Sequence, residues 1–242
     1  MSQGTDIDSI KTINEKPVKN TKFITAVYNI VGIIVGVIAL FYNFHNKTNS
    51  AVILLIYPFL GIAIILLSKG AIKLNSNDRP RILTSIYLGV LFPIMFMAVV
   101  TYDSYTFLHM DHFWLPFALI SIIMMAAFYK TNVSPIMERS KIDLVFMALM
   151  ALAYGYGSTG QIDCAFDSSS PQIYNAAVLG LREHRGRSTT DYATLAPWGP
   201  RQQVKEEEVD GWLYEHTKVG DTLQVNLRQG LLHIPWFVVT KN

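Results

Sequence analysis

The side chains in this sequence that best fit metal chemistry are histidines in two short hydrophilic stretches between apolar segments. His109, Asp111 and His112 lie close together in one stretch, and His45 lies in another. Imidazole and carboxylate groups bind zinc or copper when they converge on one ion. These residues therefore form a candidate metal site, which would support a metal-dependent extracytoplasmic activity. The alternative is that they are unrelated solvated residues, because all six histidines lie outside the apolar segments.

Cys164 is a candidate nucleophile, but it lacks neighbours that would activate it. It is the only cysteine, so an intrachain disulfide is excluded, and Asp163 and Asp167 are acids that disfavour a thiolate. The sequence contains no P-loop, no dinucleotide-binding fingerprint and no HExxH motif. We therefore predict no catalytic residue and no cofactor, which favours a non-enzymatic protein without excluding an enzyme. No basic face suited to nucleic acid is found.

Three tryptophans, Trp198, Trp212 and Trp236, lie in the C-terminal part of the chain. Tryptophan is enriched at the centres of protein–protein interfaces, so an exposed group of these rings would bind a partner. In so small a region the same rings could instead fill the core or lie at a membrane interface. The sequence leaves both interpretations open.

These residues are positioned by five apolar segments of bilayer-spanning length. A helix needs roughly 20 apolar residues to cross a hydrocarbon core, and only helices or closed barrels satisfy their backbone there. We therefore predict a transmembrane helical bundle over residues 23–160, after a cytoplasmic N-terminal segment at 1–22. The predicted spans are 23–44, 51–68, 83–101, 113–129 and 142–157. The fifth is short, so a re-entrant helix is the alternative to a full crossing.

The loops between the spans carry an uneven distribution of positive charge, which predicts orientation because basic loops stay in the cytoplasm. The loops on the opposite side hold a single basic residue, Lys47. The N-terminus is therefore predicted to be cytoplasmic and the C-terminal region extracytoplasmic, unless the fifth segment is re-entrant. The basic residues on the predicted inner side are Lys11, Lys16, Lys19, Lys22, Lys69, Lys73, Arg79, Arg81, Lys130, Arg139 and Lys141.

Small residues and prolines within the spans indicate how the helices pack. Gly32 and Gly36 have the GxxxG spacing that lets two helices approach closely, either inside one subunit or in a homo-oligomer. Pro58, Pro93 and Pro116 are each predicted to kink a helix, and kinked helices could line an apolar cavity. No Asp, Glu, Lys, Arg or His lies in the interior of the first four spans, which disfavours an ion-coupled transporter.

After the fifth span the pattern changes to short stretches of alternating apolar and polar residues separated by turn signals. We predict five strands within an extracytoplasmic domain at 161–242, with a short helix or turn around Trp212. So small an all-β domain buries its apolar faces by closure or sheet packing, as in an OB-like or SH3-like fold. The predicted strands are 173–181, 192–195, 203–209, 222–227 and 236–239.

This region resembles the C-terminal β module of uncharacterised bacterial inner-membrane proteins that have a few transmembrane helices. The resemblance covers residues 154–242. It implies bacterial origin, and it carries no activity and no site residues. It depends on Ala196-Pro197-Trp198-Gly199-Pro200, Tyr214, Gly220-Asp221, Gly230 and Pro235-Trp236.

These observations favour a non-enzymatic protein of the bacterial inner membrane whose extracytoplasmic β module binds or positions a membrane or periplasmic partner protein. The first alternative is a protein that handles lipids or small molecules in an apolar cavity between kinked helices. The second is the metal-dependent activity at His45, His109 and His112. The lipid bilayer is the one partner common to all three hypotheses.

Overall fold

The chain folds into two units in the computed structural model, which describes residues 5–42, 47–69, 71–74, 85–131, 141–185 and 189–241. The helical unit comprises Met1–Ser104 and Phe113–Ala165, and the β unit comprises Tyr105–His112 and Phe166–Asn242. The chain therefore passes between the units three times, at Ser104, at His112 and at Ala165. The loop 105–112, which separates two of the apolar helices, belongs to the β unit.

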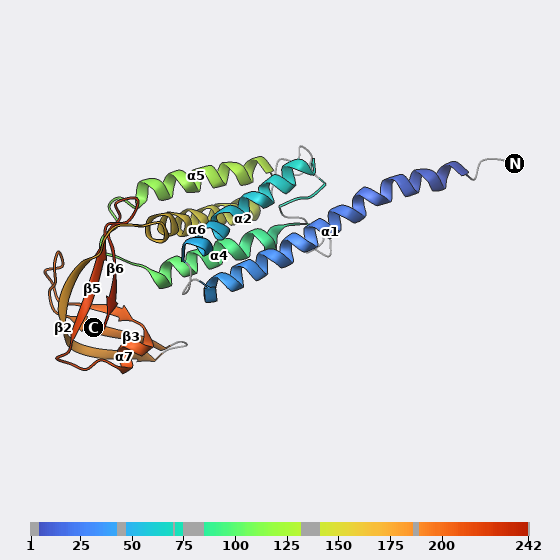
Figure 1. The fold of residues 1–242 in the computed structure, drawn as a ribbon. Coiled ribbons are helices and arrows are strands. Elements are labelled where there is room, and N and C mark those ends of the chain that lie inside the picture. Colours follow the sequence, from blue (N-terminus) through green and yellow to red (C-terminus); the bar gives the residue numbers. More distant parts are fainter. Residues whose placement is uncertain are drawn as a thin grey trace. The chain divides into compact units, whose positions relative to one another are not determined.

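Within its described residues, the helical unit contains five long apolar helices, as the sequence predicts (Figure 1). Each is long and apolar enough to cross a membrane, and in α1 the apolar stretch is Asn20–Phe41. The fifth helix continues to Ala165, beyond the predicted span and beyond the boundary predicted at residue 160. The five are α1 (Thr5–Tyr42), α2 (Lys47–Leu67), α4 (Tyr87–Ser104), α5 (Trp114–Thr131) and α6 (Lys141–Ala165).

Helix α6 runs parallel to α4 along its length. Near their starts, the rings of Tyr87 and Phe146 lie 4.9 Å apart, and near their ends the Thr101 hydroxyl donates to the Gly157 carbonyl at 3.0 Å. A re-entrant helix would turn back part of the way along its neighbours. Helix α6, with 25 residues, instead contacts α4, with 18 residues, near both of its ends, which makes it a full-length member of the bundle.

The bundle is apolar both inside and outside. Leu54, Val90, Ile94, Met97 and Met124 are fully buried at its centre. Many equally apolar side chains face outward, and Phe23, Leu115 and Ile122 are 71 %, 70 % and 65 % exposed. Continuous exposed apolar surface is rare on proteins surrounded by water, and a helix that is apolar all round is typical of a membrane span.

Helices α1 and α4 approach each other most closely where two glycines meet. A Cβ atom on Gly32 would lie 2.5 Å from the carbonyl oxygen of Gly89, which is too close for any side chain. A Cβ atom on Gly36 would lie 2.6 Å from the ring of Phe96 and 3.3 Å from the backbone of Phe92. Gly32 and Gly36 thus both face α4 within one subunit.

Three buried polar side chains in the bundle are paired with backbone atoms of neighbouring segments. The side chain of Asn29 donates to the Ser85 carbonyl at 2.7 Å and accepts from the Gly89 amide at 2.8 Å. Tyr28 and Tyr57 each donate a hydroxyl hydrogen bond to the other's carbonyl, at 3.1 and 2.6 Å, and their rings stack. Satisfied hydrogen bonds of this kind fix helix registry in an apolar environment.

The three prolines do not act alike. Pro58 and Pro93 lie inside α2 and α4, where each removes an intrahelical hydrogen bond. Pro116 is the third residue of α5, which begins at Trp114. The first-turn amides of a helix have no intrahelical acceptor, so Pro116 removes no such bond and the predicted kink there is wrong.

The β unit is a curled antiparallel sheet in which strands follow the order β1-β6-β5-β2-β3-β4. All five strands predicted from the sequence are present, and α7 forms the short helix expected around Trp212. Asp210 caps α7 by accepting from the Leu213 amide at 2.8 Å. The elements are β1 (Thr106–Phe107), β2 (Gln172–Arg185), β3 (Thr189–Leu195), β4 (Lys205–Val209), α7 (Gly211–Glu215), β5 (Thr222–Arg228) and β6 (Trp236–Thr240).

Strand β2 is the longest and joins the two halves of the sheet. Its first residues pair with β5, and its residues from Val178 onward pair with β3. The register shifts between Val178 and Gly180, and such a bulge bends a strand and increases its twist. The two halves therefore curl around one core, which contains Val178, Leu195, Leu223, Val225 and Phe237.

The sixth strand, β1, comes from the loop between α4 and α5. Thr106 pairs with Phe237 and Phe107 pairs with Trp236, at the edge of the sheet next to β6. The next residue, Leu108, donates its amide to the Pro235 carbonyl at 2.8 Å. Nothing in the local sequence predicted a strand here, because two residues are too few to show an alternating pattern.

Candidate interaction surfaces

The predicted metal site is only partly described by the structure. In loop 105–112, Nδ1 of His109 lies 3.4 Å from Oδ2 of Asp111, and both side chains are exposed to solvent. His112 follows in the same loop and is also exposed, whereas His45 lies outside the described residues. Within the described ranges, no three histidine, cysteine, aspartate or glutamate side chains form a metal-binding group. The four-residue site stays a prediction.

The three tryptophans of the β unit fall in different environments. Trp198 and Trp236 are 4 % and 5 % exposed and belong to the interior, while Trp212 is 61 % exposed on α7. The Trp212 ring stacks on the imidazole of His216, with ring centres 4.6 Å apart. Two rings therefore act as core residues, and Trp212 alone of the three is available at the surface.

Trp198 lies beside a buried ion pair that the sequence did not indicate. Arg201 and Glu207 form a salt bridge, and their side chains are 11 % and 5 % exposed. The guanidinium carbon of Arg201 lies 5.9 Å from the centre of the Trp198 ring and 5.2 Å from that of Phe237. Burial lowers the pKa of Arg201, and the paired carboxylate compensates its buried charge.

The sequence of the acidic run 206–208 indicates a strand edge with solvated side chains. That interpretation is wrong for the central residue, Glu207. Side chains alternate between the two faces of a strand. Glu207 therefore faces the core with Val209, and Glu206 and Glu208 face solvent. The turn Trp198–Arg201, closed by reciprocal backbone hydrogen bonds, brings the arginine to Glu207. Gly199 in this turn has φ +42° and lies against the Tyr174 ring.

Asp167 ties the start of the β unit to the turn that precedes β6. Its carboxylate accepts hydrogen bonds from the Ser169 amide at 2.7 Å, the Trp236 indole at 3.0 Å and the Gly230 amide at 3.1 Å. Burial raises the pKa of Asp167, but these hydrogen bonds together outweigh burial and hold its pKa below the ordinary value. The ionised carboxylate is thus a structural acceptor.

The last turns of α6 place polar side chains inside the helical unit. Gln161 and Asp163 are fully buried, and the Gln161 amide donates to the Thr101 hydroxyl at 3.2 Å. The Gln161 carbonyl oxygen and the Thr159 hydroxyl have no partner among the described residues. The predicted span ended at residue 157 and the predicted bundle at residue 160, short of the observed end of α6 at Ala165.

A groove of about 330 Å³ lies between α2, α5 and α6. Phe59 comes from α2, Ile120 and Ile123 from α5, and Tyr154 and Ser158 from α6. Both hydroxyls are engaged internally, because Tyr154 donates to the Leu55 carbonyl at 2.9 Å and Ser158 donates to the Tyr154 carbonyl at 2.5 Å. A ligand in the groove would therefore contact mainly hydrocarbon. It lies close to Pro58 and Pro116 in sequence, two of the three prolines predicted to border a cavity.

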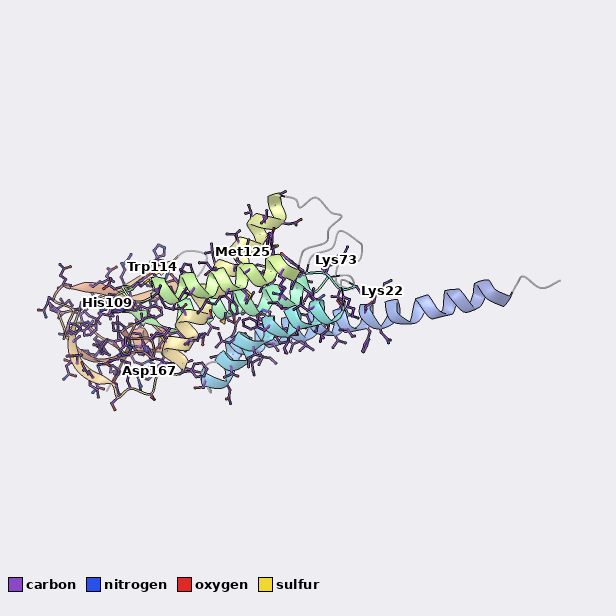
Figure 2. The ribbon with its side chains drawn as sticks, turned by 90° about the horizontal axis from the view of Figure 1, so that it is seen from above. Lys22, Lys73, His109, Trp114, Met125 and Asp167 are labelled. Atoms are coloured by element: carbon purple, nitrogen blue, oxygen red, sulfur yellow. The ribbon has the colours of Figure 1, made fainter. Side chains whose placement is uncertain are left out.

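The two ends of the bundle differ in the residues they carry. Figure 2 shows Lys22 and Lys73 near one end of the helical unit and Trp114 near the other, with Met125 between them along α5. Lysine is favoured on the cytoplasmic side of a membrane protein, and tryptophan is favoured at either membrane interface. The orientation stays a prediction.

Comparisons with known proteins assign neither unit. No protein-family model matches the chain, and no curated protein and no solved structure matches it. Function must therefore be inferred from the geometry of the two units.

Proposed function

We propose that this chain is a non-enzymatic protein of the bacterial inner membrane. Its five apolar helices cross the membrane with the N-terminus in the cytoplasm, and they hold the β unit on the extracytoplasmic side, where it binds or positions a partner protein. The observation that carries the proposal is the pairing of β1 with β6.

This pairing constrains the topology of the chain. Loop 105–112 lies between α4 and α5, and β6 follows α6. A sheet that contains residues from both places must lie on one side of the membrane. Two crossings, one by α5 and one by α6, meet this condition, and the parallel run of α4 and α6 supports that arrangement. The basic residues predicted on the inner side then leave the β unit outside the cytoplasm.

The connectivity also supports a positioning role. A domain joined by a single linker reorients freely, whereas the β unit is joined to the helices by three chain passages. A module attached in this way is tethered to the helices at three points of the chain. We also infer that the curled sheet is a small OB-like or SH3-like module, because the bent strand β2 serves both of its halves.

The test compares crosslinked partners of the full chain with those of a chain that lacks residues 166–242. A partner-binding module predicts proteins that crosslink only to the full chain. Because the deletion also removes the strand that pairs with β1, a full-length chain with Trp212→Ala provides a second, milder comparison. Identical partner sets from the full chain and the deletion would remove the proposal.

The groove between α2, α5 and α6 favours a second candidate, a protein that handles lipids or small apolar molecules. Its volume lies within the range of ligand pockets, and its hydroxyls are engaged internally. Under this alternative, Ile123→Trp fills the groove and lowers the amount of lipid that co-purifies. Leu119→Trp is a matched control, because Leu119 is 53 % exposed on the same helix and does not line the groove. Equal lipid content in both variants would argue against a lipid site.

A further inference from the structure

Strand β4 forms one edge of the sheet, and among the described strands it pairs only with β3. In an antiparallel ladder, alternate residues direct their N–H and C=O groups to opposite sides. An edge strand therefore presents a row of these groups without a ladder partner. The other edge is β1, which has two residues against five in β4. Of the two terminal strands of the sheet, β4 thus offers the longer edge.

The exposed face of this edge carries an ordered row of charged and aromatic side chains. The register places Arg182, Tyr192 and Glu208 side by side on β2, β3 and β4. The Arg182 guanidinium lies 5.0 Å from the centre of the Tyr192 ring and donates to Glu206 at 2.7 Å. Glu208 forms no ion pair with any residue that the structure describes. The outermost charge of the row is thus an uncompensated carboxylate.

The same charges disfavour pairing between two copies of this edge. An antiparallel pair centred on Glu207 would place Glu206 of one copy opposite Glu208 of the other. Like charges directly opposite each other destabilise a strand pair, and opposite charges stabilise it. An incoming strand with lysine or arginine at alternate positions would meet the unpaired carboxylate of Glu208, and at Glu206 it would share a carboxylate with Arg182. The edge therefore discriminates between a second copy and a basic segment.

We propose that the β4 edge is the docking site for an extended, basic segment of a partner protein. The segment adds a strand beyond β4 through main-chain hydrogen bonds. Two of its lysine or arginine side chains, separated by one residue, lie opposite Glu206 and Glu208. The basic side chain opposite Glu208 pairs with the carboxylate that lacks an internal partner. This inference rests on the proposed function of the β unit, and it specifies the chemistry of the partner.

A peptide-binding experiment with the purified full chain in detergent micelles tests the docking site. The probe is a short, fluorescently labelled synthetic peptide that alternates valine and lysine, and the comparison peptide alternates valine and glutamate. We expect the lysine peptide to bind more weakly as salt rises and the glutamate peptide not to bind. Because the added strand pairs with the backbone, binding should also slow amide hydrogen exchange within Lys205–Val209.

Matched charge variants distinguish a specific edge from a generally acidic surface. Glu208→Lys should raise the dissociation constant of the lysine peptide roughly tenfold, since it replaces attraction by repulsion. Glu215→Lys makes the same change of charge on the exposed side of α7 and should leave that constant unchanged. Equal losses in both variants, exchange protection confined to other strands, or failure of the lysine peptide to bind would each overturn the docking site.

The outcome for the docking site is separable from that for the proposed function. The lysine peptide could fail to bind while partners still crosslink only to the chain that retains residues 166–242. In that case the β unit binds its partner at another surface. If no crosslink depends on those residues, the partner-binding function itself is wrong, whatever the peptide does.

Discussion

Thr106, in the loop between two apolar helices, pairs with Phe237 near the end of the chain. The two residues are separated by α5, α6 and most of the sheet, yet they occupy opposite positions in neighbouring strands. This pairing makes loop 105–112 part of the β unit, and it requires both chain regions to lie on the same side of any membrane that the helices cross.

The first prediction follows from this shared location. In a Cys164→Ser background, which has no other cysteine, Asp111→Cys and Lys218→Cys should both react with a membrane-impermeant maleimide in intact cells. Both positions are exposed, one in loop 105–112 and one in the turn before β5. We expect parallel labelling because the sheet joins the two regions.

Lys22→Cys serves as the inner control, since Lys22 lies at the basic end of the helical unit (Figure 2). It should react only after the membrane is permeabilised. Labelling of Asp111→Cys without Lys218→Cys, or the reverse, would contradict the single-sided sheet. Labelling of Lys22→Cys alone would reverse the orientation and leave the topology intact.

The second prediction concerns the buried ion pair. Glu207→Gln should lower the free energy of unfolding of the β unit by about 3–5 kcal/mol, because it leaves the Arg201 charge buried without its counter-ion. Urea unfolding of the full chain in detergent, followed by tryptophan fluorescence, measures the loss. Trp198 is a suitable reporter, since it lies against Arg201.

Glu206→Gln on the neighbouring residue is the matched control. It removes the pair with Arg182, whose side chain is 53 % exposed, and exposed pairs contribute at most about 1 kcal/mol. If the two variants lose equal stability, the Arg201–Glu207 pair is not buried as described. The double variant Arg201→Leu with Glu207→Leu should recover part of the loss, because no uncompensated charge remains.

The third prediction is a pH dependence at Asp167. Its pKa is lowered in the folded chain, so its ionised form stabilises the β unit above the unfolded-state pKa of about 4. That contribution should disappear as the pH falls through the lower, folded-state pKa. Asp167→Asn should reduce stability by about 1–2 kcal/mol at neutral pH.

The measurement is the free energy of unfolding between pH 7 and pH 2 for the original chain and for Asp167→Asn. The two curves should converge at acidic pH. Protonation there removes the ionised Asp167 carboxylate from the original chain, and the substitution removes it at every pH. Parallel curves over the whole range would indicate that Asp167 has the same pKa in the folded and unfolded states.

The fourth prediction separates the two glycines of α1. Gly32→Ala should destabilise the helical unit by about 1–3 kcal/mol, because the added methyl group meets the Gly89 backbone and must push α1 from α4. Gly36→Ala should cost less, since its nearest contact is a side chain, Phe96, and the nearest backbone atoms, in Phe92, lie 3.3 Å away. Thermal unfolding in detergent compares them. A change of oligomeric state in either variant, with unchanged monomer stability, would instead favour the homo-oligomer interpretation of this motif.

The sequence by itself determined the five apolar helices and the five longer strands. Both kinds of element are local signals, because span length and alternation between neighbouring residues record which faces are apolar. The helix boundaries were less well predicted. The polar residues Gln161 and Asp163 obscured the end of α6, and Pro116 suggested a kink at a position that proves to be the first turn of α5.

Only the tertiary structure decided which residues meet. Thr106 and Phe107 are a strand because β6 provides backbone partners, and no local pattern records a partner far along the chain. Glu207 faces the core rather than solvent because the register of β4 and the turn at Gly199 bring Arg201 to it. The same register directs Glu208 outward at the free edge. Local apolar patterns specify elements, whereas long-range pairing specifies surfaces, and the proposed partner-binding edge is a product of that pairing.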